Sequence, residues 1–223
     1  HETGVEELSR QVETEFAELR DTELKLPERD VAAISAYFAP PQLSPRAEGW
    51  ANLAQWKKAD PEFARWVQNN VQPHKHPDYG MVTISLKPIG GIPGDATDTQ
   101  MEAVADIAEE YAFDEIRVSH EQNLILPHVA LADLEPVYRG LVAAGLATAN
   151  AGLITDIIAC PGLDYCALAN ARSIPVAQEL STRFGSPERQ AEIGELKIKI
   201  SGCINACGHH HVGHIGLLGV EKK

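Results

Sequence analysis

The sequence has 223 residues, of which 44% are hydrophobic, and it carries a formal net charge of −13. A chain of this length and composition can bury an ordinary core, so we expect one large or two small globular domains. No basic segment precedes an apolar run at the N-terminus, and no apolar run reaches about eighteen residues, which predicts a cytoplasmic protein without a signal peptide or membrane span. The acidic charge and the scattered basic residues argue against a nucleic-acid partner.

Both ends of the sequence resemble cut ends. The first residue is His1 rather than methionine, and Lys223 closely follows an apolar, strand-like run. We therefore expect a fragment of a longer parent chain, to which the function inferred below would belong.

The first predicted segment, residues 1–77, is helical. Apolar residues recur at three- and four-residue steps from Val5 to Leu19, which places them on one face of a helix. A second helix is predicted over 28–38, before two prolines. A further helical stretch contains three tryptophans that we expect to pack in the core: Trp50, Trp56 and Trp66.

The second predicted segment, residues 78–150, alternates strands and helices. Apolar and polar residues alternate over 82–86, the pattern of a half-buried strand. Thr97 and Gln100 have the spacing of a capping box at the start of a helix. Two short strands and a helix follow, at 116–119, 124–127 and 134–144. The order predicts an α+β ferredoxin-like unit, a small antiparallel sheet with helices on one face.

The third predicted segment, residues 151–223, starts an α/β domain that is incomplete. An apolar strand over 153–159 leads into Cys160, and an alternating strand leads into Cys203. A helix capped by Ser173 lies between the two strands. Lys197 and Lys199 alternate with apolar residues, which predicts that they lie on the solvent face of their strand.

All four cysteines of the chain fall in this third segment, as the pair Cys160 and Cys166 and the pair Cys203 and Cys207. Two short-spaced pairs in a chain without a secretory signal favour a bound metal or cluster over disulfides. The five-residue gap of the first pair is wide for a zinc site, whereas an iron–sulfur cluster suits longer loops that contain glycine. Spacing alone favours a cluster, leaves zinc as an alternative, and ranks free or disulfide-linked thiols last.

The segments ACPGLDYCALANARS and ISGCINACGHHHVGHIGLLG resemble the paired signature of the sirohaem-dependent nitrite and sulfite reductases. The segments YGMVTISLKPIGGIPGDATDTQ and IRVSHEQNLIL are similar to one ferredoxin-like half-domain of that family. The resemblance implies a [4Fe-4S] cluster held by Cys160, Cys166, Cys203 and Cys207, with Cys207 also bridging to the sirohaem iron. It further implies cofactor-facing positions for Asn205, Ser201, Gly202, Gln122 and Asn123.

The implied parent is an oxidoreductase of sulfur assimilation that reduces sulfite to sulfide with six electrons, or a nitrite reductase that forms ammonia. Its implied partners are sulfite or nitrite and an electron-transfer protein, either a flavoprotein reductase or a ferredoxin. The family's anion-binding arginines and lysines lie largely in the half that precedes such a segment, so we assign no catalytic residue here. We expect the fragment alone to be inactive, with or without its cofactors.

Two alternatives stay open at this point. The first is a zinc-stabilised binding module, in which the cysteines are structural and the ferredoxin-like unit binds a partner. The second is a fragment that folds around its ferredoxin-like unit and leaves the cysteine loops empty, with reduced and reactive thiols.

The histidines form two groups. A tract near the last cysteine invites a metal-site interpretation, but hydrogen bonding near the cofactor or solvation is the better one: His209, His210, His211 and His214. Four others lie apart in predicted loops and are assigned no role: His74, His76, His120 and His128.

Overall fold

The computed structural model describes residues 3–46 and 48–221, and its contacts divide the chain into two units between Leu43 and Ser44. The first unit contains α1 (Val5–Leu19) and α2 (Glu28–Tyr37), which confirms both helices predicted there. In the described part of the chain, no helix is both long and apolar enough to cross a membrane.

The second unit begins with two helices, α3 (Glu48–Ala59) and α4 (Pro61–Asn70). The Asp60 carboxylate starts α4, because it accepts hydrogen bonds from the backbone N–H groups of Glu62 and Phe63, each at 3.0 Å. Trp66 on α4 is fully buried, as predicted, and Trp56 packs against the same core. The prediction is wrong for Trp50, which lies exposed on α3.

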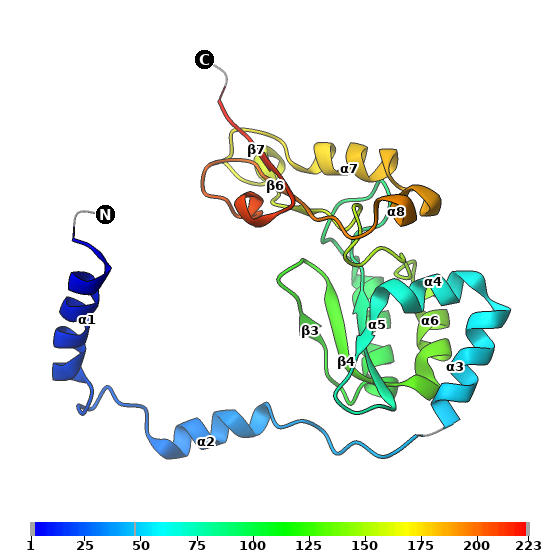
Figure 1. The fold of residues 1–223 in the computed structure, drawn as a ribbon, viewed down its shortest axis with the longest axis horizontal. Coiled ribbons are helices and arrows are strands. Elements are labelled where there is room, and N and C mark those ends of the chain that lie inside the picture. The colour runs from blue at the N-terminus through cyan, green and yellow to red at the C-terminus, as the bar shows by residue number, and fades with distance from the viewer. Residues whose placement is uncertain (1–2, 47, 222–223) are drawn as a thin grey trace. The chain divides into compact units, whose positions relative to one another are not determined.

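The ferredoxin-like unit contains a four-stranded antiparallel sheet in the order β1-β2-β4-β3, of which β3 and β4 are labelled in Figure 1. Its strands are β1 (Val71–Pro73), β2 (Tyr79–Ile84), β3 (Arg117–Val118) and β4 (Leu124–Ala130). Its helices are α5 (Asp98–Tyr111) and α6 (Leu134–Ala143), preceded by the short helix η1 (Leu131–Asp133). The predicted antiparallel sheet with helices is confirmed.

One hydrophobic core joins this sheet to α4, α5 and α6. It contains Trp66 from α4, Val82 and Leu126 from the sheet, Val104 from α5 and Leu134 from α6, all essentially inaccessible to solvent. The helices of 48–70 therefore share a core with the ferredoxin-like sheet. The limits 1–77, 78–150 and 151–223 stay predictions.

The predicted capping box at the start of α5 is present. Gln100 N–H donates to the Thr97 hydroxyl at 3.2 Å, and Thr97 N–H donates to the Gln100 side chain at 3.0 Å. We expect Thr97→Ala to lower the free energy of unfolding by about 1 kcal/mol, because one backbone donor at the helix start loses its partner. Urea denaturation measures this loss. The neighbouring exposed variant Thr99→Ala is the control, and an equal loss in both variants would contradict a specific capping role.

The remainder of the second unit is a three-stranded parallel sheet in the order β5-β6-β7. The strands are β5 (Ile158–Ala159), β6 (Ile198–Ser201) and β7 (Ile215–Leu218), with α7 (Ile174–Arg183) and α8 (Pro187–Ile193) between the first two. The short helices η2 (Gly162–Asp164) and η3 (His210–Val212) complete it. A second core forms where Ile198 and Ile200 pack with Ile157, Ala159 and Ala177.

Three predictions for this part of the chain are corrected by the structure. The strand predicted over 153–159 is limited to β5, because the preceding residues form a turn closed by Asp156 N–H and Leu153 C=O at 2.9 Å. Ser173 precedes α7 but makes no side-chain capping bond. Lys199 is not on a solvent face, since it is only 6% exposed.

Candidate functional site

The two cysteine pairs begin at the carboxyl ends of adjacent parallel strands. Cys160 directly follows β5, and Cys203 lies two residues after β6. The two strands pair in register, with Ala159 opposite Ile200, and Cys160 N–H donates to Ile200 C=O at 3.1 Å. Because parallel strands end at the same edge, both pairs start from one edge of the sheet.

The two cysteine loops are also joined directly. The backbone N–H groups of Asn170 and Ala171 both donate to Gly202 C=O, at 2.8 and 3.1 Å. Gly202 N–H donates to the Cys160 sulfur at 3.0 Å, and the Ser173 hydroxyl lies 3.6 Å from the same sulfur. The loop of the first pair and the loop of the second pair therefore form one structural element.

Glycine is required at two places in this element. Gly162, in the first loop, has a φ of +62°, and a Cβ there would press against Ala171 C=O. Gly208, directly after Cys207, packs on β6 so closely that a Cβ would overlap Ile200 C=O. These contacts fix the path of each loop next to a cysteine.

The four thiols are free and differ in exposure. Cys160 and Cys203 are buried, Cys166 is half-buried and Cys207 is exposed. Among the described residues, no three His, Cys, Asp or Glu side chains lie close enough to hold a single metal ion. A lone zinc ion needs four ligands within about 2.3 Å of its centre, whereas an iron–sulfur cube spreads its thiolates around a wider volume. Four thiols that start from one sheet edge are the donor set that a [4Fe-4S] cluster uses.

Three large apolar side chains that neighbour the cysteines in sequence face solvent. Tyr165, Leu168 and Ile204 are 76%, 74% and 79% exposed, and each lies within two residues of Cys166 or Cys203. Exposed apolar side chains of this size are ones that a bound group or a partner can cover.

The residues expected to approach the cofactor fall into two sets. Asn205 is exposed in the loop between Cys203 and Cys207. Ser201 and Gly202 are buried, and the Ser201 hydroxyl accepts a hydrogen bond from Gly208 N–H at 3.1 Å. Ser201 therefore stabilises the loop, and its cofactor contact stays a prediction, as does that of Asn205 and Gly202.

Gln122 and Asn123 lie in the turn between β3 and β4, and both side chains are engaged within the chain. Gln122 bonds both backbone polar groups of Ala159, at 2.9 and 3.1 Å. Asn123 is buried, accepts a hydrogen bond from Leu86 N–H and donates to Asp156, each at 3.0 Å. The turn thus contacts the strand that carries Cys160.

A buried ion pair that the sequence did not indicate lies beside this turn. The Lys87 ammonium lies 2.8 Å from the Asp156 carboxylate, with side chains that are 2% and 4% exposed. Lys87 also donates to Glu121 C=O at 2.6 Å. The only sign in the sequence is a charged residue within each of two apolar runs, and 69 positions separate the partners.

The histidine tract and the lone histidines behave differently. His214 accepts a hydrogen bond from Lys197 N–H at 2.9 Å, and His209 and His211 are exposed.

His128 is not in the loop predicted for it but in β4, where it is buried. Its Nδ1 lies 3.0 Å from Nε2 of His74. His74 accepts from His76 N–H at 2.8 Å, so its remaining nitrogen carries the proton that it donates to His128.

We expect this pair to make stability depend on pH. Burial lowers the pKa of His128 below its ordinary 6.5, as do the neighbouring His74 ring and the Arg117 guanidinium, against the opposing Glu115 carboxylate. Below pH 6.5, His128 therefore binds a proton more readily in the unfolded chain than in the folded one. Its contribution to the free energy of unfolding is fully present above pH 6.5 and is lost as the pH drops below that value. Urea denaturation at about pH 7.5 and about pH 5.5 measures the fall. If the free energy of unfolding of His128→Phe falls by the same amount between these two pH values, His128 is not the cause of the pH dependence.

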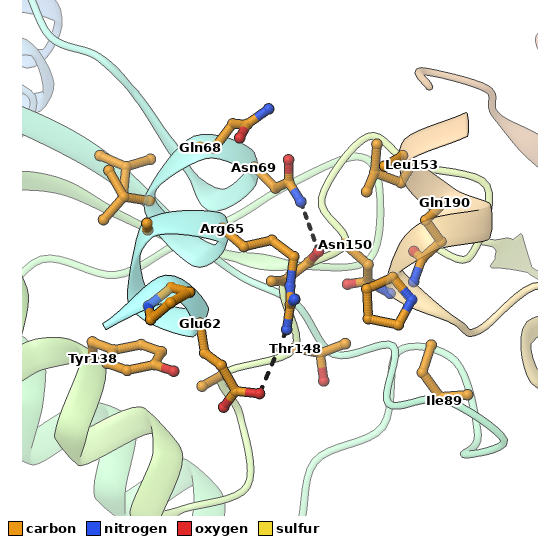
Figure 2. A pocket seen from close by; sticks show the side chains of 18 of the residues that line it. Glu62, Arg65, Gln68, Asn69, Ile89, Tyr138, Thr148, Asn150, Leu153 and Gln190 are labelled. Atoms are coloured by element: carbon orange, nitrogen blue, oxygen red, sulfur yellow. Dashed lines mark hydrogen bonds and ion pairs between the residues drawn. The ribbon is translucent and has the colours of Figure 1, made fainter. Parts of the chain in front are cut away.

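A cavity of about 1170 Å³ is lined by residues other than the cysteines (Figure 2). It is bounded by α4, the segment 147–153 and α8, and no cysteine or histidine lines it. Its polar groups largely bond to one another: Asn69 donates to Ala149 C=O at 2.9 Å, and Arg65 lies 3.7 Å from Glu62. The cavity gathers no group suited to redox chemistry, so we assign it no role.

Comparison with known proteins agrees with the ferredoxin-like fold. A family model described as "Nitrite/Sulfite reductase ferredoxin-like half domain" matches residues 73–144. The chain is 32% identical over 144 residues to "Sulfite reductase [ferredoxin] 2" of Mycolicibacterium paratuberculosis, covering 63% of this chain and 25% of the relative. It is 28% identical over 172 residues to "Ferredoxin--nitrite reductase" of Synechococcus elongatus, covering 74% of this chain and 31% of the relative.

A solved structure shows the same fold. The NirA protein of Mycobacterium tuberculosis superimposes with a TM-score of 0.52 at 26% identity, over 63% of this chain and 25% of that chain. The chain thus spans between a quarter and a third of the length of these relatives. The half-domain match, the relatives and the shared fold show that the chain is similar to the nitrite and sulfite reductases, and that residues 73–144 match their ferredoxin-like half-domain.

Proposed function

We propose that Cys160, Cys166, Cys203 and Cys207 hold a [4Fe-4S] cluster, and that Cys207 is shared with the iron of a sirohaem. The observation that carries this proposal is the pair of hydrogen bonds from Asn170 and Ala171 to Gly202 C=O, at 2.8 and 3.1 Å. These bonds join the loops of the two cysteine pairs at one sheet edge. Together the bound groups would supply single electrons to a substrate anion at the haem iron.

The chain's own residues hold and tune the thiolates. Gly202 N–H donates to the Cys160 sulfur at 3.0 Å, which stabilises negative charge there. Hydrogen bonds to cluster sulfurs and exclusion of solvent set the reduction potential of such centres. Burial of Cys160 and Cys203 supplies that exclusion on one side, and the exposed Cys207 sulfur is left open to a second group.

We propose sulfite as the substrate, reduced to sulfide, with a ferredoxin as the electron donor. Relatives named as ferredoxin-dependent sulfite reductases support this assignment. Nitrite, reduced to ammonia, is the second candidate, because other relatives are named ferredoxin–nitrite reductases. We propose the activity for the complete polypeptide that contains these 223 residues, since the matches cover only a part of each relative.

Steady-state kinetics of the complete polypeptide, with reduced ferredoxin and with either anion, test the proposal. We expect the higher kcat/KM with sulfite. A higher value with nitrite would select the second candidate, and no turnover of either anion by a polypeptide that contains both cofactors would overturn the proposed function.

A further inference from the structure

The strand that leads into Cys160 lies at the edge of its sheet. In the strand order β5-β6-β7, β5 pairs with β6 on one side, and no described strand pairs with it on the other. Cys160 N–H bonds to Ile200 on β6, so the N–H and C=O groups of Ala159 point to the unpaired side. Ala159 is only 4% exposed, so water cannot satisfy these groups freely.

The side chain of Gln122 occupies the place of the missing strand. Its amide NH2 donates to Ala159 C=O at 2.9 Å, and its amide oxygen accepts from Ala159 N–H at 3.1 Å. One side chain thus provides the donor and the acceptor that a neighbouring strand would provide. The residue that it holds is the direct neighbour of Cys160.

The turn that presents Gln122 is itself fixed. Gln122 has a φ of +58°, in the left-handed region, and the turn is closed by Ser119 N–H donating to Asn123 C=O at 2.8 Å. The Ser119 hydroxyl accepts from the N–H groups of Glu121 and Asn123, at 3.2 and 3.1 Å. The turn is therefore closed by its own hydrogen bonds, without help from the cysteine loops.

Further contacts attach the same turn to the cysteine-bearing strands. The Glu121 carboxylate pairs with the Lys197 ammonium at 2.5 Å, just before β6. Asn123 donates to Asp156, two residues before β5, at 3.0 Å. Each strand that leads to a cysteine pair is thus bonded to the ferredoxin-like half-domain through one turn.

We propose that Gln122 is a positioning residue, which fixes Cys160 for ligation by holding the free edge of β5. This inference rests on the proposed function for its purpose, because Cys160 is one of the four proposed cluster ligands. The amide of Gln122 acts on Cys160 through its two hydrogen bonds to the backbone of Ala159. The half-domain then sets the position of the first ligand, in addition to any contact that it makes with the cofactor itself.

Alkylation of the cofactor-free, reduced 223-residue chain by iodoacetamide tests this inference, with the rate at each cysteine measured by mass spectrometry. Gln122→Gly keeps the positive φ of the turn and removes the amide. Because two buried backbone groups lose their partners, local opening of β5 becomes more frequent, and we expect Cys160 to react about tenfold faster. Gln122→Asn keeps an amide that is one methylene too short, and we expect a similar increase.

Three controls separate positioning from general stability. The rate at the exposed Cys207 should not change in either variant. Val137→Ala removes buried methyl groups from the half-domain core without touching the turn. Gln55→Ala removes an exposed glutamine on α3. An unchanged rate at Cys160 in Gln122→Gly, or an equal rise in Val137→Ala at matched loss of stability, would overturn the inference.

The same chains separate this inference from the proposed function. Faster alkylation of Cys160 in Gln122→Gly supports the positioning role whatever metal the complete polypeptide contains. Zinc in that polypeptide would overturn only the proposed cluster. Conversely, the wild-type polypeptide could contain the cluster while Gln122→Gly leaves the alkylation rate at Cys160 unchanged. That result would keep the proposed function and reject the positioning role.

Discussion

Replacing Cys203 with serine is expected to remove the iron and the acid-labile sulfide from the complete polypeptide. Cys203 is buried at the end of β6, in the loop that Gly202 joins to the first pair. A serine there offers a poor ligand for iron, and four thiolates are needed to hold the cube. We expect the iron content to fall from about five atoms per chain, four in the cluster and one in the sirohaem, to about one or fewer. Iron and sulfide assays, together with the visible absorption spectrum, measure this.

The matched control is a histidine in the same segment. His211 is exposed eight positions after Cys203, and His211→Ala should leave the iron content unchanged if the histidine tract is not a metal site. Loss of iron in His211→Ala, with full retention in Cys203→Ser, would contradict the cysteine assignment and favour the histidine tract.

Removing one partner of the buried ion pair is expected to have the largest effect on folding. In Asp156→Ala, the Lys87 ammonium stays buried without its carboxylate, and Asn123 and Gly152 each lose an acceptor. Breaking a buried pair in this way costs about 3–5 kcal/mol of unfolding free energy. Urea denaturation of the 223-residue chain measures the loss, which should be among the largest for any single substitution in this unit.

Two further variants show whether the charge is responsible. Glu192→Ala breaks a solvent-exposed pair with Arg189 and should cost less than about 1 kcal/mol. The double variant Lys87→Met with Asp156→Ala removes both buried charges, so its loss should be smaller than that of Asp156→Ala alone. A loss in Asp156→Ala no larger than that in Glu192→Ala would show that the pair contributes nothing.

Much of the secondary structure follows from local patterns in the sequence. The helix of α5 could be predicted because Thr97, Gln100 and a regular apolar face are all local signals. The helix predicted over 134–144 corresponds to α6, Leu134–Ala143, which is followed by Gly145 with a positive φ of +71°. The alternation in 82–86 likewise identified β2, although the strand itself is Tyr79–Ile84.

Features that depend on distant partners could not be predicted. Lys199 has the alternation of a solvent-facing residue, but the fold buries it. The pairing of His74 with His128 joins positions that are 54 residues apart, so neither position alone indicates it. Trp50 lies on α3, which packs in the core through Leu53. The presence of a tryptophan in a predicted helix does not show which face of that helix is buried.

The candidate site divides in the same way. That both cysteine pairs follow strands is visible in the sequence, and the parallel pairing of β5 with β6 brings those strand ends to one edge. The bonds from Asn170 and Ala171 to Gly202 join loops with no sequence pattern that pairs them. Gln122 was singled out by family resemblance, but its bonds to Ala159 depend on a contact across 37 positions.

The most direct test of the central claim is the metal and sulfide content of the complete polypeptide as purified, read together with its visible absorption spectrum. We predict about five iron atoms for each chain, four in the cluster and one in the sirohaem, and about four acid-labile sulfides, with the absorption bands of sirohaem. Stoichiometric zinc without sulfide, or disulfides that join the cysteines of each pair, would contradict the account.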